Sequence, residues 1–155
     1  MKRVLCVCLG NICRSPTAEA VLRRRAADAG IALTVDSAGT SAWHIGEPPD
    51  PRTRAAAAAR GYDLSACRGR QVTRADFHSF DFLLAMDREN LRQLQAMAPA
   101  TGRSQVQLFG DYLSGVSAGA EVPDPYYGGE DGFEQVLDLI EAASDSLLQV
   151  LQEQA

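Results

Sequence analysis

Near the amino end lies the stretch VLCVCLGNICRSP, residues 4–16. Residues 3–7 form a short apolar run rich in Val and Leu, which is typical of a strand covered on both faces. The run stops at Gly10. Ser15 before Pro16 then favours a helix start, with serine as the N-cap and proline at the first helical position. The stretch therefore predicts a strand, a tight loop and a helix in succession.

The rest of the chain continues this alternation. Over residues 16–29 apolar side chains recur at helical spacing, and Gly30 is suited to end that helix. The later elements are predicted as a strand at 33–35, an Ala-rich helix ending near Arg60, a strand at 80–85, a helix at 88–97, a short strand at 106–109 and a closing helix at 131–151. This order predicts a single α/β domain over residues 1–155, with a four-stranded parallel sheet, helices on both faces and a phosphate loop after the first strand.

Length and composition agree with one folded domain. The chain has 155 residues, of which 46% are hydrophobic and 23% charged, close to globular averages. No apolar run approaches the roughly 18 residues that a membrane span requires, so we expect neither a span nor a signal peptide. Three of the four cysteines lie between Cys6 and Cys13, which is unlike a framework of long-range disulfides. We therefore expect a reducing, cytoplasmic location.

The charge distribution excludes several function classes. All 15 basic residues, 14 Arg and Lys2, lie at or before Arg103, so residues 1–110 carry a net charge of +5 and residues 111–155 carry −10. The overall charge of −5 argues against general binding of nucleic acid or of an anionic membrane. A single lysine argues against a Walker A loop and a Schiff base. With only His44 and His78, a Ser-His-Asp triad or a His-rich metal site is not expected.

Cys8 is the first candidate for chemistry. It sits at the predicted carboxyl end of the first strand, where open α/β sheets place their ligands. A short turn over residues 9–13 can point backbone N–H groups inward as an anion site, with the helix N-terminus completing it. A thiol in that field beside Arg14 is expected to be a thiolate nucleophile at neutral pH, and the forked guanidinium suits a tetrahedral oxyanion. The alternative is a buried cysteine in an ordinary strand-to-helix loop.

Asp124 is the second candidate. Pro123 and Pro125 restrict the backbone around it, and so hold a carboxyl group on a rigid loop ahead of the last helix. Such a group could act as general acid for the leaving oxygen of a phosphomonoester attacked by Cys8, and then as general base for water. The alternative is ordinary turn chemistry, for which Asp is common.

The motifs together resemble the low-molecular-weight protein tyrosine phosphatases. The resemblance rests on residues 4–16, on Asp36-Ser37-Ala38-Gly39 and on Asp124-Pro125-Tyr126-Tyr127-Gly128-Gly129, and it extends through GEPPDPR at 46–52, Arg70-Gln71 and Met86-Asp87. It therefore covers essentially the whole chain, with its two main motifs near opposite ends.

The resemblance implies a role for each matching residue. Cys8 would be the nucleophile, Arg14 the phosphate clamp and Asp124 the general acid and base. Ser15 would donate a hydrogen bond to the Cys8 sulfur, and Asn11 would adopt a left-handed conformation supported by neighbours that include Ser37. The phosphate-binding loop would comprise Leu9, Gly10, Asn11, Ile12, Cys13, Arg14 and Ser15, and the walls of the substrate cleft would comprise Trp43, Tyr126 and Tyr127. Without the resemblance, Trp43 would be taken as a hydrophobic loop anchor.

Three cysteines need separate interpretation. Cys67 stands where many family members have a histidine that braces the loop asparagine, and a thiol is a poor substitute for imidazole in hydrogen bonding. The resemblance also implies a reversible Cys8-Cys13 disulfide that protects the nucleophile from overoxidation, so the enzyme would be redox-sensitive. Cys6 is expected in the core.

The implied activity is a metal-independent and cofactor-free hydrolysis of phosphotyrosine and aryl phosphate monoesters through a phosphocysteine. Its partners would be phosphotyrosine-containing proteins, and its product inorganic phosphate. The rivals on the same fold are a thioredoxin-coupled arsenate reductase, which needs relay cysteines, and a phosphoarginine phosphatase, against which Ile12 and the pair Tyr126-Tyr127 argue. Two further alternatives are a zinc module using Cys6, Cys8 and Cys13, which lacks an evident fourth ligand, and an inactive phosphotyrosine reader.

Overall fold

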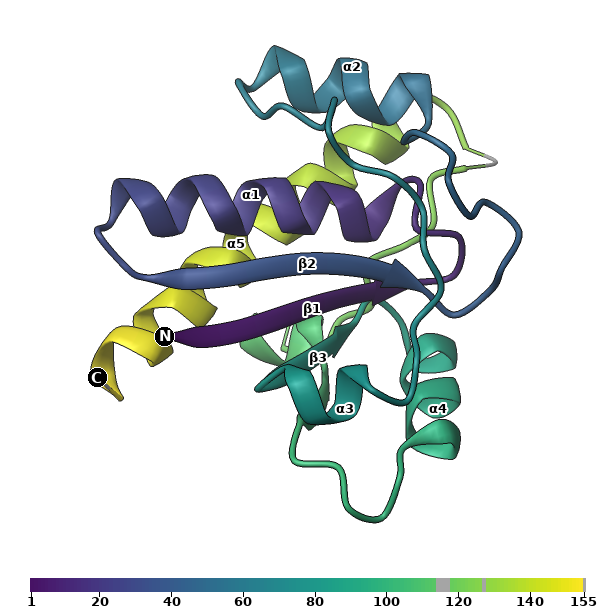
Figure 1. Ribbon diagram of the computed structural model, residues 1–155. Coiled ribbons are helices and arrows are strands. Elements are labelled where there is room, and N and C mark those ends of the chain that lie inside the picture. Colours follow the sequence, from purple (N-terminus) through teal and green to yellow (C-terminus); the bar gives the residue numbers. More distant parts are fainter. Residues whose placement is uncertain (114–117, 127, 155) are drawn as a thin grey trace.

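A four-stranded parallel sheet forms the centre of the molecule (Figure 1). The computed structural model describes residues 1–113, 118–126 and 128–154. The strands are β1 (Lys2–Cys8), β2 (Leu33–Gly39), β3 (Phe82–Ala85) and β4 (Gln105–Leu108), in the order β2-β1-β3-β4. The central strand β1 is buried from Val4 to Cys8, as its unbroken apolar run predicts. Its last residue, Cys8, pairs with Gly39 of β2.

Helices cover both faces of the sheet, as predicted. On one face lie α1 (Arg14–Asp28) and α5 (Glu130–Glu153), with α2 (Pro51–Ala59) packed outside them; α3 (Asp76–Ser79) and α4 (Arg88–Met97) cover the other (Figure 1). Alternate residues of β1 enter the two cores: Val4, Cys6 and Cys8 join the first, whereas Leu5 and Val7 join the second. The predicted apolar side of α5 is buried throughout its length: Phe133, Val136, Leu137, Ile140, Ala143, Leu147 and Leu151.

The structure corrects several predicted boundaries. Helix α1 begins at Arg14, and its N-cap is Cys13 without a side-chain capping bond, so the prediction of Ser15 as N-cap is wrong. Ser15 lies inside the first turn because the loop is tighter than the serine-proline pattern suggests, and its hydroxyl points to Cys8. Strand β2 extends past residue 35 to Gly39 because it pairs with β1 along its whole length. The four-residue α3 is too short to leave a helical period in the sequence.

Among the helices of the described residues, none combines the length and apolar character that crossing a bilayer requires.

Candidate active site

The loop over residues 9–13 connects the carboxyl end of β1 to the first residue of α1 and folds around the Cys8 sulfur. The Asn11 N–H donates to Cys8 Sγ at 3.3 Å, and Ser15 Oγ lies 3.0 Å from the same atom. The first N–H groups of α1 have no intrahelical acceptor, and no side chain caps them. The sulfur therefore faces main-chain donors and the positive end of a helix, a field that favours a bound anion.

Asn11 sets the shape of this loop. It has φ 58°, and within the described ranges it is the sole non-glycine residue at positive φ; asparagine tolerates that region well. Its Nδ2 donates to Ser15 Oγ at 2.8 Å, and its Oδ1 accepts from the Arg70 backbone N–H at 3.0 Å. Both ends of the amide are thus satisfied by fixed groups, and the residue is 3% exposed. These two contacts hold the left-handed turn in place.

Ser37 does not support Asn11 directly, contrary to expectation. Its hydroxyl donates to Glu19 Oε1 at 2.7 Å, because the Asn11 amide already has its partners in Ser15 and Arg70. Glu19 in turn accepts from Arg23 Nη2 at 2.6 Å. Ser37 thus joins β2 to α1 beneath the loop.

The Ser15 hydroxyl can donate a hydrogen bond to the Cys8 sulfur. Its Oγ accepts from the Asn11 amide, so its one hydrogen is free for an acceptor. Two acceptors are near, Cys8 Sγ at 3.0 Å and Ala38 O at 3.4 Å. The shorter contact is to the sulfur, and a thiolate there can only accept, so Ser15 donates to it when Cys8 is ionised.

Gly39 allows the loop to lie against β2. A Cβ at this position would stand 2.8 Å from Leu9 O, closer than real Cβ contacts, and 3.2 Å from the Gly10 carbonyl carbon, which is also tight. Backbone bonds from Thr40 N to Cys8 O at 2.9 Å and from Ser41 N to Leu9 O at 3.0 Å secure the approach. Glycine at this position of the Asp36-Ser37-Ala38-Gly39 motif therefore has a steric reason.

Arg14 is buried beside the loop and anchored on one nitrogen. It is 2% exposed. Its Nη1 donates to Asp87 Oδ2 at 2.6 Å and to Val122 O at 3.1 Å, while Nη2 lies 3.6 Å from Asp124 Oδ2. Burial alone would lower the pKa of Arg14, but the Cys8 sulfur and the Asp87 hydrogen bond outweigh it and raise that pKa. The guanidinium thus stays charged and directed toward the cavity.

Asp124 and two aromatic residues complete one small cavity of about 130 Å³. The Asp124 side chain is 39% exposed, and its Oδ1 accepts from Tyr126 N at 3.0 Å. Trp43 and Tyr126 stand at the mouth, 73% and 37% exposed. The cavity is lined by Cys8, Leu9, Gly10, Ile12, Cys13, Arg14, Trp43, His44, Asp124 and Tyr126. Tyr127, the remaining predicted wall residue, lies outside the described residues. The structure thus gathers motifs from opposite ends of the chain into one site.

The sequence analysis assigned no role in the site to three residues, Asp87, Arg70 and His44, although the first two lie in motifs that carry the resemblance. Asp87 caps α4 by accepting from Asn90 N at 2.8 Å while it also holds Arg14. In the sequence, an aspartate before a helix predicts only the helix cap and not the contact with Arg14. Arg70 holds Asn11 through its backbone, which no side-chain pattern could predict. His44 lines the cavity, and its Nδ1 lies 2.7 Å from Glu47 Oε2; a lone histidine in a loop carried no signal.

Cys6, Cys13 and Cys67 are all at least partly buried. Burial raises the pKa of Cys13 to about 12 and that of Cys67 to about 11, and burial also raises the pKa of Cys6 well above its ordinary value. All four cysteines are free. Cys6 lies in the core, as expected. Within the part of the chain that the structure describes, no three His, Cys, Asp or Glu side chains are placed to hold a metal ion.

Comparison with known proteins agrees with this arrangement. The family model described as low molecular weight phosphotyrosine protein phosphatase matches residues 3–155. A low molecular weight protein-tyrosine-phosphatase of Streptomyces coelicolor is 49% identical over 156 residues, covering 98% of this chain and 94% of that protein. Among solved structures, a protein tyrosine phosphatase from Entamoeba histolytica superposes with a TM-score of 0.93 at 39% identity, covering 99% and 98% of the two chains. A Drosophila arginine phosphatase superposes with a TM-score of 0.90 at 33% identity, covering 97% and 98%.

Proposed function

This chain belongs to the low molecular weight phosphotyrosine protein phosphatase family, and from that premise we propose that Cys8, Arg14 and Asp124 divide the hydrolysis of phosphotyrosine among them. The protein is an enzyme, a protein-tyrosine phosphatase that hydrolyses phosphate monoesters. The observation that carries the assignment is the Cys8 sulfur, held by Asn11 N and Ser15 Oγ in a cavity that Arg14 and Asp124 also line.

In the first step, the Cys8 thiolate attacks phosphorus while the bond to the tyrosyl oxygen breaks. Asp124 transfers its proton to that oxygen, which matters because tyrosine has a pKa of about 10 and leaves poorly as the anion. The main-chain N–H groups of residues 9–15 and the Arg14 guanidinium bind the three non-bridging oxygens. The product is tyrosine and a phosphocysteine.

In the second step, water attacks the phosphocysteine. Asp124, now ionised, takes a proton from that water, and the phosphorus-sulfur bond breaks to release inorganic phosphate and the Cys8 thiolate. Ser15 stabilises the departing sulfur through the 3.0 Å contact between Ser15 Oγ and Cys8 Sγ. The scheme uses no metal or cofactor, so activity is expected to survive chelators and to require a reduced thiol.

The substrate group is proposed to be phenolic. Ile12, Trp43 and Tyr126 line the cavity and favour a flat aromatic ring. The second candidate is a phosphoarginine phosphatase, because the Drosophila arginine phosphatase shares the fold at a TM-score of 0.90. Comparing kcat/KM for phosphotyrosine and phosphoarginine on the same preparation decides between them, and higher activity on phosphoarginine would overturn the assignment. The third candidate is a thioredoxin-coupled arsenate reductase, which is tested by measuring thioredoxin-dependent arsenate reduction with the same purified protein.

Cys13 is proposed as the resolving partner of an oxidised Cys8. Oxidant converts Cys8 to a sulfenic acid, and Cys13 displaces water from it to form a disulfide. In support, Cys13 lines the same cavity as Cys8. Mass spectrometry after mild peroxide should find Cys8 linked to Cys13, whereas a sulfonic acid at Cys8 with Cys13 free would refute this role. A thiolate nucleophile suits a reducing compartment, so we also infer a cytoplasmic location.

Two variants test the main assignment. Cys8→Ser should abolish turnover while the circular dichroism spectrum stays unchanged. Asp124→Ala should lower kcat/KM on phenyl phosphate by about 10²-fold or more, since a general acid contributes roughly that much, and should affect p-nitrophenyl phosphate far less because its phenol is more acidic. An equal loss on both substrates would show that Asp124 is not the acid.

A further inference from the structure

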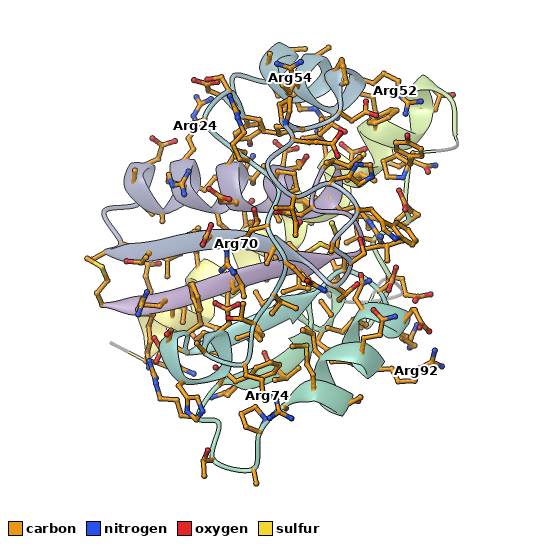
Figure 2. All side chains as sticks on the ribbon, turned by 45° about the vertical axis from the view of Figure 1, so that its right-hand side comes forward. Arg24, Arg52, Arg54, Arg70, Arg74 and Arg92 are labelled. Carbon is orange, nitrogen blue, oxygen red and sulfur yellow. The ribbon has the colours of Figure 1, made fainter. Side chains whose placement is uncertain are left out.

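Arg52 lies in the first turn of α2 and reaches across to the segment that carries Asp124. Its Nη2 donates to the backbone oxygen of Tyr126 at 2.9 Å. Its guanidinium carbon stands 5.5 Å from the Tyr126 ring centroid and 5.0 Å from that of Phe133, within the range of a cation–π contact. Figure 2 shows Arg52 at the N-terminal end of α2 beside the start of α5, with Arg54 further along α2.

The same guanidinium is tied to the phosphate loop through Asp50. Nε and Nη2 of Arg52 lie 3.1 and 3.0 Å from the two carboxylate oxygens of Asp50, a paired contact that lysine could not reproduce. The Arg52 hydrogen bond lowers the pKa of Asp50, so that carboxylate stays ionised. The Asp50 N–H then donates to Ile12 O at 2.9 Å. A continuous path therefore joins the loop around Cys8 to Tyr126.

The Asp124 segment needs such an external contact. Proline on either side of Asp124 removes two backbone donors, and the Tyr126 N–H is used locally on Asp124 Oδ1. Before Asp124, the backbone is also held by the Val122 N–H, which donates to Met86 O at 2.8 Å, whereas after it the contacts from outside are to carbonyls. Arg14 holds the oxygen of Val122, two residues before Asp124, and Arg52 holds the oxygen of Tyr126, two residues after it.

We propose that Arg52 is a positioning residue that fixes the Asp124 carboxyl over the phosphate loop by clamping the backbone of Tyr126. This inference rests on the proposed role of Asp124 and goes beyond it, because Arg52 has no part in the chemical steps. Arg14 positions one side of the segment and binds phosphate, whereas Arg52 positions the other side only. Loss of Arg52 should therefore impair proton donation and leave phosphate binding intact.

The experiment compares Arg52→Ala and Arg52→Lys with wild type and with a matched control, Arg54→Ala. Arg54 is exposed on the same short helix. For each protein, kcat/KM is measured on phenyl phosphate and on p-nitrophenyl phosphate, together with the inhibition constant of inorganic phosphate. Hydrogen exchange of the Tyr126 and Gly128 amides reports directly on the clamped segment.

Arg52→Ala should lower kcat/KM on phenyl phosphate about tenfold more than on p-nitrophenyl phosphate. This loss is smaller than the roughly 10²-fold expected when the acid itself is removed, because a misplaced Asp124 still donates its proton some of the time. The inhibition constant of phosphate should stay within about twofold, as expected for intact binding groups. Both amides should exchange faster. Arg52→Lys should lose less activity on phenyl phosphate than Arg52→Ala but more than wild type, because lysine keeps the charge but cannot make the paired contact with Asp50. Arg54→Ala should match wild type on both substrates.

If Arg52→Ala lowers kcat/KM equally on both substrates, or leaves the exchange of the Tyr126 and Gly128 amides unchanged, the proposed positioning role of Arg52 is wrong. Asp124→Ala, run in parallel, separates this failure from that of the proposed mechanism. If Asp124→Ala is selective against phenyl phosphate and Arg52→Ala is not, the inference alone is wrong. If Asp124→Ala loses activity equally on both substrates, the acid assignment is wrong, and the claim that Arg52 positions a catalytic acid falls with it.

Discussion

Asn11 is the residue of the phosphate loop that adopts a left-handed conformation. A left-handed conformation costs a non-glycine residue roughly 1–2 kcal/mol, and a typical buried hydrogen bond returns about 1 kcal/mol. The contacts from Asn11 to Ser15 Oγ and from Arg70 N to Asn11 Oδ1 offset that cost. The backbone N–H of Arg70 thus supports Asn11, a role for which the family resemblance implies a histidine in many members.

Cys67 tests this account. Its side chain is half-buried near Glu19 and Arg23, and Arg70 N already satisfies the Asn11 carbonyl. We therefore predict that Cys67→His leaves kcat/KM on p-nitrophenyl phosphate intact or raises it by about twofold, the effect of a few tenths of a kcal/mol. Steady-state kinetics with a Cys67→Ala control measure this. A fall of tenfold or more with the fold preserved would mean that the thiol itself supports the loop.

At the scale of elements, ion pairs join α5 to the arginine-rich part of the chain. No Lys or Arg follows Arg103, so α5 is acidic. Glu141 in its middle accepts from Arg60 Nη1 at 2.6 Å, from Arg25 Nη2 at 3.0 Å and from Tyr62 Oη at 2.6 Å. The uneven charge distribution along the chain is therefore partly neutralised in the fold, where α1 and the end of α2 meet α5.

This cluster predicts a pH dependence of stability. Burial opposes ionisation of Glu141, but the hydrogen bonds from Tyr62 and Arg60 outweigh it and lower the pKa of Glu141. A carboxyl whose pKa is lower in the folded state stabilises the fold above its unfolded pKa of about 4.3, and that contribution is lost as pH falls through the folded pKa.

Glu141→Gln should therefore lower the free energy of unfolding at pH 7 by about 1–3 kcal/mol. Urea titrations at pH 7 and near pH 3.5 should show this gap narrowing at the lower pH. Glu153→Gln, an exposed acid near the end of the same helix, serves as the control and should change little. A gap of equal size at both pH values would contradict the ion-pair explanation.

At the scale of the whole molecule, the site joins segments that are distant in sequence. The Asp87 that holds Arg14 follows β3, whereas Val122 and Asp124 precede α5. A ligand bound between these segments stabilises only the folded chain, so its binding free energy adds to the stability of the fold.

Inorganic phosphate should accordingly protect the enzyme against thermal unfolding. At about 100 times its Kd the expected gain is about 2.7 kcal/mol, or several degrees in Tm for a chain of this size. Thermal scans with phosphate, and with sodium chloride at equal ionic strength, measure the effect. Arg14→Ala should lose most of the protection. Equal protection by chloride, or full protection of Arg14→Ala, would show that phosphate acts elsewhere.

Much of this protein follows from local sequence. The apolar run of β1, the helical spacing of α5 and the Cys8 to Arg14 loop each depend on residues within a few turns of one another, and the structure has them where the sequence predicts. Strand boundaries do not follow from local sequence because they depend on pairing between strands: β2 extends to Gly39 because β1 continues beside it.

Short-range chemistry and periodicity were enough to predict the order of the four strands and the longer helices, but not α3, and to place Cys8 and Arg14 at the junction of the first strand and helix. Four contacts of the site depend instead on how the chain packs: Asp87 with Arg14, Arg70 N with Asn11, Ser37 with Glu19 and Arg52 with Tyr126. Those contacts join residues brought together by strand order and helix packing, and no spacing along the chain encodes such distances.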